Sequence, residues 1–400
     1  MSVTDRDPLL EYRAEFPILD RCTYLVSNSL GAMPRAIPAR LAEYAEAWGG
    51  LGVRAWASEW WDMPVRVGDA IAPLIGAGPG EIAMLPNVTI GQTAVLSSLT
   101  YEGARDGIVM TDLDFPSVRY VYDGLAARLG ARIEVVPSDD GVSIDTERLL
   151  AAIDERTRLV AISHVLFRSA YIMDVAAICA RAHEVGALVS VDSFHAVGVI
   201  PVDVRALGVD FLTGGVLKWL CGGPGGCFLW VAPQVSRTLT PAFTGWQAHA
   251  RPFGFEPHME PADGAWRWLN GTPVIPALYA ASEGPRLVRE AGIERIRAKS
   301  TRQTTHLIAR AREHGWAVTA PEDGSRRGGT VAIDVPHAYG VAQALLAENI
   351  VVDYRPNAGI RVGPHFYTSD DELDRAIEGI DDILRHERFA SFERTRGVVT

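Results

Sequence analysis

Three consecutive segments, "RLVAISHV" (158–165), "DVAAICARAHEVG" (174–186) and "ALVSVD" (187–192), decide the fold of this chain. The first and third are short apolar runs, typical of strands that are buried on both faces. The middle segment has helical spacing and ends at a glycine, a common C-terminal cap. Together they predict a strand, a crossover helix and a second, parallel strand.

The same alternation extends from about residue 80 to residue 231, where "DFLTGG" (210–215) and "GCFLWV" (226–231) predict two further strands. We expect the Pro- and Trp-rich segment 232–280 to be irregular, and long ordered loops are often functional. "GPRLVREAGIERIRAKSTRQTTHLIARAREHG" (284–315) predicts one long helix, followed by short strands and a closing helix over 370–388. We therefore expect an N-terminal arm with part of a small domain (1–60), a large α/β domain (61–284) and a small C-terminal α+β domain (285–400).

Composition excludes several classes of protein. The chain has 400 residues, 48% of them apolar, and a formal net charge of −11, which argues against a nucleic-acid partner or an anionic membrane. Its four cysteines form no CxxC pair, so neither a disulfide framework nor a zinc site is expected. The first twenty residues lack the basic segment and apolar core of a signal peptide, and no run of about 18 apolar residues occurs. We expect a cytoplasmic protein.

Candidate catalytic residues follow two neighbouring strands. Asp192 and His195 lie in "VDSFHAVG" (191–198), and Lys218 lies in "GGVLKWLCGGPGG" (214–226). Ligands of open α/β sheets bind outside the carboxyl ends of the strands, so the three side chains are expected to meet in one crevice. An apolar flank lowers the pKa of a lysine and makes it a nucleophile toward carbonyl groups. An aspartate there can keep a pyridine nitrogen protonated, and the pair suggests pyridoxal phosphate.

A phosphate site is expected at the start of a helix in "PNVTIGQTAV" (86–95). Backbone N–H groups at a helix N-terminus bind phosphate. Val88 and Thr89 would supply these groups, and Thr89 would add its hydroxyl.

At these residues the chain resembles the class V aminotransferase superfamily, that is, fold type I pyridoxal-phosphate enzymes, and it is most similar to kynureninases. Six stretches follow the kynureninase order and spacing: "YLVSNSLGAMP" (24–34), "FPSV" (115–118), "VDSFHAVG" (191–198), "LKWLCGGPG" (217–225), "FTGWQAHARPFGFEPHMEPADGAWRWLNGTP" (243–273) and "GIRVGPHFYTSDDEL" (359–373). The resemblance implies a large doubly wound domain with a mostly parallel sheet and a small C-terminal domain.

The resemblance also implies roles for residues of this chain. Lys218 would form the Schiff base with the cofactor, Asp192 would pair with the pyridine nitrogen, and His195 would lie near the ring. Phe115 would stack on the ring, and Val88 and Thr89 would hold the phosphate. In a homodimer with shared active sites, Trp246 and Asn270 would reach the cofactor from the partner subunit. Arg361 would clamp the carboxylate of a small amino-acid substrate, and Asn28 and Ser29 would close over it.

Three positions depart from the kynureninase pattern: Leu217 replaces a tyrosine, Val118 an aspartate, and Gly49 a histidine that binds the substrate ring. These changes remove groups for proton transfer and aryl binding but leave the cofactor residues. We therefore expect chemistry at Cα or Cβ of an L-amino acid other than kynurenine, in specialised metabolism.

Several alternatives stay open. The chain could be an aminotransferase, or a C–S lyase or a decarboxylating or oxidatively deaminating enzyme on a cysteine S-conjugate, as in lincosamide-type antibiotic assembly. It could also be a non-catalytic cofactor-binding scaffold. Desulfuration is disfavoured because Cys221 and Cys227 lie beside the lysine and not on a late mobile loop. The roles of Arg168 and His249 also stay open.

Overall fold

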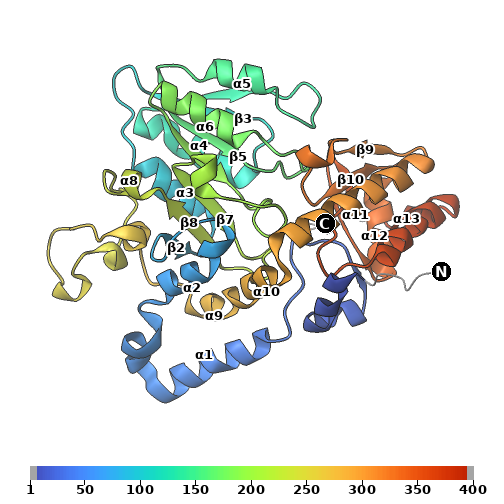
Figure 1. The fold of residues 1–400 in the computed structure, drawn as a ribbon, viewed down its shortest axis with the longest axis horizontal. Coiled ribbons are helices and arrows are strands. Elements are labelled where there is room, and N and C mark those ends of the chain that lie inside the picture. Colours follow the sequence, from blue (N-terminus) through green and yellow to red (C-terminus); the bar gives the residue numbers. More distant parts are fainter. Residues whose placement is uncertain (1–6, 394–400) are drawn as a thin grey trace.

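The computed structural model describes residues 7–393 and shows a large seven-stranded sheet covered by helices on both faces (Figure 1). The strand order is β2-β8-β7-β6-β5-β3-β4. β8 runs antiparallel to β2 and β7, and the other neighbours are parallel. The predicted α/β class with a mostly parallel sheet is confirmed. The strands are β2 Ile82–Leu85, β3 Gly107–Thr111, β4 Arg132–Val136, β5 Thr157–Ser163, β6 Leu188–Asp192, β7 Phe211–Gly215 and β8 Cys227–Val231.

Alternate residues of each strand enter separate cores on the two faces of this sheet, as the two-residue period of a strand requires. In β5, Leu159 and Ala161 pack with helices α3 (Val88–Ser97) and α4 (Pro116–Leu125). Val160 and Ile162 pack with α6 (Val175–Glu184) and α2 (Met63–Ile71) on the other face. Both faces are covered, which explains the continuous apolar runs in the sequence. Short helices α5 (Thr146–Ala152), α7 (Val204–Leu207) and α8 (Pro233–Ser236) complete this part.

The strand–helix–strand unit predicted over 158–192 is present as β5, α6 and β6. Asp174 begins α6, and its side chain accepts a hydrogen bond from the backbone N–H of Ala177. Two residues after the helix, Gly186 has a φ of 73°, a conformation that glycine adopts without steric cost.

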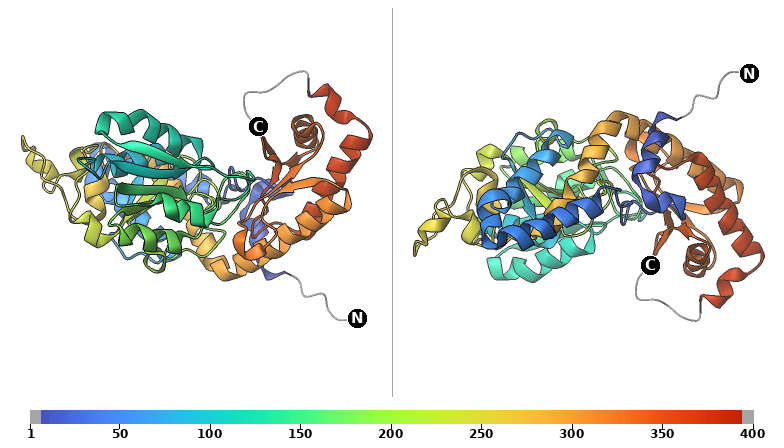
Figure 2. Two further views of the ribbon diagram at one scale, coloured as in Figure 1. Left: turned by 90° about the horizontal axis from the view of Figure 1, so that it is seen from above. Right: turned by 90° about the horizontal axis from the view of Figure 1, so that it is seen from below.

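A second, smaller sheet forms the C-terminal part, with order β12-β13-β10-β9 and antiparallel pairing throughout. Its own apolar core is separate from the two cores of the large sheet. Figure 2 shows this part beside the large one, with the dark-blue N-terminal segment against it. The elements are β9 Ala317–Thr319, β10 Val331–Asp334, β12 Asp353–Arg355, β13 Gly359–Val362, α11 Ile293–Glu313, α12 Ala338–Ala347 and α13 Asp370–Arg385.

The prediction of a single helix over 284–315 is wrong, because the structure has two helices there. α10 covers Glu283–Ala291, and α11 starts after Gly292, whose φ is 83°. Leu287 and Val288 of α10 join the core of the large sheet, whereas Leu307 of α11 joins the small core. The domain limits 1–60, 61–284 and 285–400 stay a proposal, and residues 1–6 and 394–400 lie outside the described residues.

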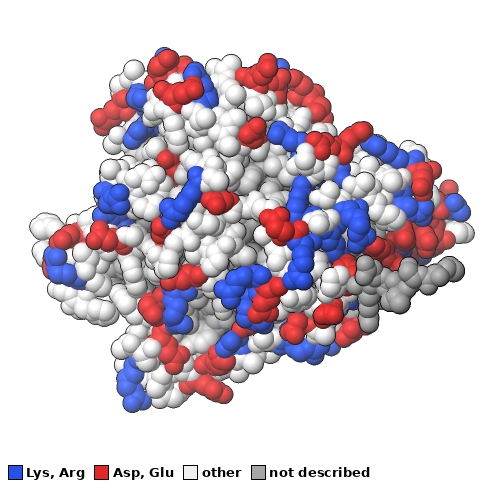
Figure 3. Space-filling model, viewed as in Figure 1, with Lys and Arg blue, Asp and Glu red and all other residues white. Residues whose placement is uncertain are grey.

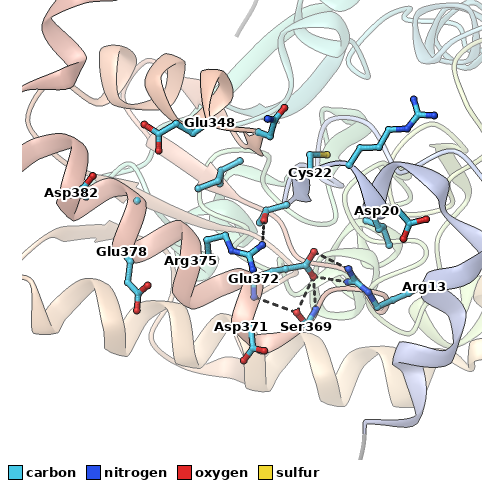
Figure 4. A pocket seen from close by; sticks show the side chains of 16 residues that line it. Arg13, Asp20, Cys22, Glu348, Ser369, Asp371, Glu372, Arg375, Glu378 and Asp382 are labelled. Carbon is cyan, nitrogen blue, oxygen red and sulfur yellow. Dashed lines mark hydrogen bonds and ion pairs between the residues drawn. The ribbon is translucent and has the colours of Figure 1, made fainter.

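The N-terminal arm joins the small part to the large one. Strand β1 (Thr23–Tyr24) pairs in parallel with β11 (Ile350–Val351), and α1 (Ile37–Leu51) runs along the base of the large part (Figure 1). Figure 4 shows a polar pocket of about 710 Å³ between the arm and α13. There Arg13 forms an ion pair with Glu372 at 2.7 Å, and Glu372 also caps α13 through Ser369. These pairs hold the arm in place.

The segment after α8 projects from the large part in all the ribbon views, where it is yellow (Figures 1 and 2). It contains only short helical turns until α9 (Ile275–Ala281), so the irregular segment predicted over 232–280 ends earlier than expected. No helix within residues 7–393 is long and apolar enough to cross a membrane. On the face shown in Figure 3, acidic and basic side chains are interspersed.

The buried imidazole of His365 is expected to make the free energy of unfolding depend on pH. This residue is 2% exposed, its Nε2 lies 2.7 Å from the carbonyl oxygen of Trp219, and its Nδ1 has no partner among the described residues. Burial lowers the pKa of the imidazole to about 3. Below an unfolded pKa of about 6.5 the unfolded chain binds a proton that the folded chain does not, so stability falls with falling pH until about pH 3.

We expect His365→Gln, which keeps an N–H donor, to lower the slope of unfolding free energy against pH by up to about 1.4 kcal/mol per pH unit in this window. Denaturant unfolding at a series of pH values measures both slopes. Equal slopes in the wild type and the variant would show that His365 is not buried in its neutral form.

Candidate active site

A cavity of about 430 Å³ lies where the chain leaves the carboxyl ends of β6 and β7. Eight of the candidate site residues line it together, although they come from six separate segments. They are Asn28, Ser29, Val88, Phe115, Asp192, His195, Lys218 and Arg361. Such a position at the strand ends is the usual ligand site of an open α/β sheet.

Lys218 brings an amine into this cavity. Its Nζ lies 2.6 Å from Nε2 of His195 and 5.2 Å and 5.3 Å from the ring centroids of Phe115 and Phe194. Burial lowers the pKa of the Lys218 ammonium, while the charge of Asp192 opposes this shift. Burial and the neighbouring Lys218 also lower the pKa of His195, which stays a neutral hydrogen-bonding partner. A lysine with a lowered pKa is a nucleophile at neutral pH.

Lysine is also rare in this chain: the only other one is Lys299. Lys299 lies in α11, where its Nζ donates a hydrogen bond to the carbonyl oxygen of Phe366 and pairs with Asp7, each at 2.7 Å. Its side chain is 4% exposed. Of the two lysines of the chain, Lys218 is therefore the one that lines the cavity.

Asp192 supplies a carboxylate at the end of β6. It is 6% exposed, and its Oδ1 accepts a hydrogen bond from the backbone N–H of Phe194 at 3.0 Å. Burial raises the pKa of this carboxyl group, although the Phe194 N–H and the charge of Lys218 oppose the shift. A buried carboxylate of this kind is stabilised by a cationic partner in the cavity.

Phe115 is positioned by a residue that sequence reasoning missed. The buried Asp114 accepts hydrogen bonds from the backbone N–H groups of Thr111 at 2.8 Å and Ser163 at 2.7 Å, and so ties the ends of β3 and β5 together. Phe115 follows at the start of α4 and packs edge-on against Phe167. The aspartate directly before "FPS" in the sequence is the signal from which this positioning residue could have been predicted.

The start of α3 faces the cavity as expected for an anion site. The Asn87 side chain accepts a hydrogen bond from the N–H of Ile90, and Val88 lines the cavity. Thr89 is exposed, and its side chain is not among the lining residues within 7–393. Its role as a phosphate ligand stays a proposal.

Trp246 and Asn270 do not line the cavity within the described chain; they belong to the projecting segment. Trp246 is 43% exposed and packs on Trp61 and Phe253. The Asn270 Nδ2 is buried without a hydrogen-bond partner among residues 7–393. A role for either residue from a partner subunit stays a proposal.

Arg168 and His249, whose roles the sequence left open, lie at different places. The guanidinium of Arg168 lies 5.1 Å from the ring centroid of Phe167, and Arg168 is not among the cavity-lining residues within 7–393. His249 accepts the N–H of Arg251 at 2.8 Å within the projecting segment, which indicates a local structural role.

The three departures from the kynureninase pattern also lie apart. Leu217 lines the cavity, where an aliphatic side chain can neither donate nor accept a proton. Val118 is buried in the core between α4 and the sheet. Gly49 lies in α1 with no atom within 4 Å of the position of a β-carbon.

Gly31 brings the arm directly onto the backbone of Lys218. Its N–H donates to the carbonyl oxygen of Leu217 at 2.8 Å, and a β-carbon at residue 31 would lie 2.2 Å from the carbonyl oxygen of Lys218. We expect Gly31→Ala to cost about 1–3 kcal/mol of unfolding free energy through overpacking. Gly49→Ala, in open space on a helix, is the control and should gain about 0.5–1 kcal/mol. Denaturant unfolding measures both, and an undisturbed Gly31→Ala variant would contradict this packing.

Comparisons with known proteins identify the family and agree with the fold. The family described as aminotransferase class-V matches residues 23–367. The kynureninase of Pseudomonas fluorescens is 34% identical over 405 residues, covering 98% of this chain and 96% of that protein. The apo structure of a cysteine desulfurase from Thermococcus onnurineus NA1 superposes with a TM-score of 0.83 at 21% identity, covering 96% of this chain and all of that one. A C-DES mutant with glycine covalently linked to its PLP cofactor gives a TM-score of 0.84 at 22% identity, over 92% of this chain and 99% of that one.

Proposed function

This chain belongs to the class V aminotransferase family, and we propose that it is a kynureninase-like pyridoxal-phosphate enzyme that acts at Cα or Cβ of an L-amino acid. The observation that carries the proposal is the pairing of one desolvated lysine with one buried carboxylate in the same cavity. A catalytically silent scaffold has no need for a lysine with a lowered pKa, because such a group costs stability.

The residues of the cavity fit pyridoxal 5'-phosphate, which is the cofactor. Lys218 can bind its aldehyde, and Asp192 can hold the proton of its pyridine nitrogen. The N-terminus of α3 offers backbone N–H groups to the phosphate. Phe115 and Phe194 supply flat apolar rings near the Lys218 amine.

When bound, the cofactor draws electrons from the Cα of an attached amino acid and so weakens the bonds at that atom. The side chains of this protein supply the rest. Lys218 Nζ accepts and returns the proton at Cα, while Nε2 of His195 orients that amine. Phe115 and Phe194 exclude water from it. Arg361 and its neighbours bind the carboxylate of the amino acid.

Cleavage at the β-bond is the favoured outcome. Among the side chains that line the cavity, Lys218, with its lowered pKa, is suited to moving a proton at neutral pH, whereas His195 stays neutral and Leu217 contributes only an aliphatic wall. The same amine would then serve both Cα and the departing group. The use of one amine for both proton transfers fits a β-elimination or lyase reaction on a substrate whose side chain leaves readily.

We further propose that the protein is a homodimer. The projecting segment exposes a cluster of aromatic side chains, with Trp246, Phe253 and Phe255 exposed by 43%, 62% and 75%. Exposed apolar clusters of this kind are usual at protein interfaces. Light scattering on the purified protein determines the subunit number.

The test of the proposed function is a spectroscopic and product assay of the holoenzyme. The purified protein is titrated with L-kynurenine, L-alanine and S-methyl-L-cysteine while the cofactor absorbance is recorded, and products are identified by mass spectrometry. Release of the β-substituent supports the proposal, whereas conversion only in the presence of an added keto acid would identify an aminotransferase. No spectral change with any amino acid would leave the scaffold alternative.

A further inference from the structure

Arg361 is almost fully occupied within the chain. Its Nε donates to Oδ1 of Asp353 at 2.8 Å and its Nη2 to Oδ2 of the same carboxylate at 2.5 Å. Nη1 donates to the carbonyl oxygen of Phe167 and Nη2 to Ser29 Oγ, both at 2.8 Å. A guanidinium has five N–H donors, so four are committed and one remains. Arg361 alone therefore lacks the free fork that grips a carboxylate with two parallel hydrogen bonds.

A second arginine in the same cavity has fewer of its donors committed. Arg355 lines the cavity two residues after Asp353, in β12. Its Nη2 lies 3.3 Å from Oδ2 of Asp353, and one Nη1 donor goes to the carbonyl oxygen of Tyr354 at 2.8 Å. Its side chain is 31% exposed, compared with 2% for Arg361. Arg355 is the better placed of the two to meet a ligand.

The balance of charges at the cavity wall indicates an anionic ligand. Two guanidiniums face one carboxylate, that of Asp353, whose own pKa lies below its ordinary value because the hydrogen bonds and charge of Arg361 outweigh its burial. One positive charge is left over at the wall of the cavity. A single carboxylate from the ligand would neutralise it, and buried charges are stable only when they are paired.

Asn28 supplies an independent observation at the same place. Its side chain is fully buried, lines the cavity, and neither its Nδ2 nor its Oδ1 has a hydrogen-bond partner within residues 7–393. Asn28 lies against β13, because a β-carbon on Gly363 would come within 2.2 Å of its Oδ1. A buried amide without partners costs free energy unless a ligand satisfies it.

We propose that Arg355 is a specificity-determining residue: it binds the carboxylate of the amino acid, together with the remaining N–H of Arg361 and the amide of Asn28. The inference rests on the proposed function, since it assumes an amino-acid substrate. Asp353 acts here as a positioning residue that holds Arg361 in one orientation beside Arg355. The site selects amino acids over the amines that lack the carboxylate.

The experiment compares each amino acid with its decarboxylated counterpart. Dissociation constants for L-alanine and ethylamine, and for S-methyl-L-cysteine and 2-(methylthio)ethylamine, are measured from the cofactor absorbance of the holoenzyme. Arg355→Gln is expected to weaken amino-acid binding roughly 10- to 100-fold, the loss of a hydrogen-bonded ionic contact, and to leave amine binding unchanged. Arg355→Lys, which keeps the charge but not the planar fork, should fall between the two.

The control variant is Arg148→Gln, which removes an exposed ion pair with Asp139 at the start of α5 and should change neither constant. Equal weakening of amino acid and amine by Arg355→Gln would mean a structural role and overturn the proposal, as would no weakening at all. If Arg355→Gln fails to fold, Arg355→Lys carries the same comparison. A wild-type spectrum that no amino acid changes would instead refute the proposed function and this inference with it.

Discussion

Replacing Lys218 with alanine is expected to remove the absorbance band of the lysine-bound cofactor and to lower turnover by roughly 10²- to 10⁴-fold or more, since we propose that the same amine binds the cofactor and moves the Cα proton. No other residue can take its place. Lys299, the second lysine of the chain, lies in α11 and is held there by contacts with Asp7 and the carbonyl oxygen of Phe366. The measurement is the spectrum and turnover of Lys218→Ala beside the wild type after both are incubated with pyridoxal phosphate.

The two-lysine composition allows a sharper form of this test. Borohydride reduction of the wild-type holoenzyme fixes the cofactor on the lysine that holds it, and peptide mass spectrometry then locates it. We expect the label on Lys218 alone. A label on Lys299 would refute the assignment, because it would show that the cofactor reaches Lys299 despite its ion pair with Asp7. An unchanged spectrum in Lys218→Ala would refute it as well.

Neutralising Asp192 has the second-largest expected effect. Asp192→Asn keeps the size of the side chain and its acceptor for the Phe194 N–H, but it removes the charge that we propose holds a proton on the pyridine nitrogen. We expect the cofactor to stay bound and kcat to fall by about 10²- to 10³-fold, as when one preorganised electrostatic group is lost from an active site. The cofactor absorbance and steady-state kinetics measure the two effects separately.

A matched control lies at the other end of the same sheet. Asp210 precedes β7, is 4% exposed, and accepts hydrogen bonds from Val189 and His183. Asp210→Asn should leave kcat of the folded enzyme unchanged. Since burial raises the pKa of Asp192, its ionised form costs stability at neutral pH, and the Asp192→Asn apoprotein should be no less stable than the wild type. A loss of activity that followed only the loss of fold would contradict the catalytic role.

Much of the fold could be predicted because its signals are local. The apolar runs of β5 and β6, the helical spacing of α6 and the glycine after it each depend on neighbouring residues only. Parallel strands put their carboxyl ends on one edge of the sheet, so the positions of Asp192 and Lys218 directly after strands were enough to predict that they meet. The break at Gly292 was missed because the helical pattern continues across it and only the packing of α10 on the large core separates the two helices.

The sequence by itself determined the strand and helix order, the family motifs and the residues that can react. The tertiary structure alone decided how those residues are paired. Arg361 reads in the sequence as a free carboxylate clamp, yet Asp353, Ser29 and Phe167 take four of its donors because β12, the arm and the loop after β5 converge on it. Hydrogen bonds between segments that are far apart in the chain leave no periodic trace in the sequence, so the availability of a charged group becomes visible only when the chain is folded.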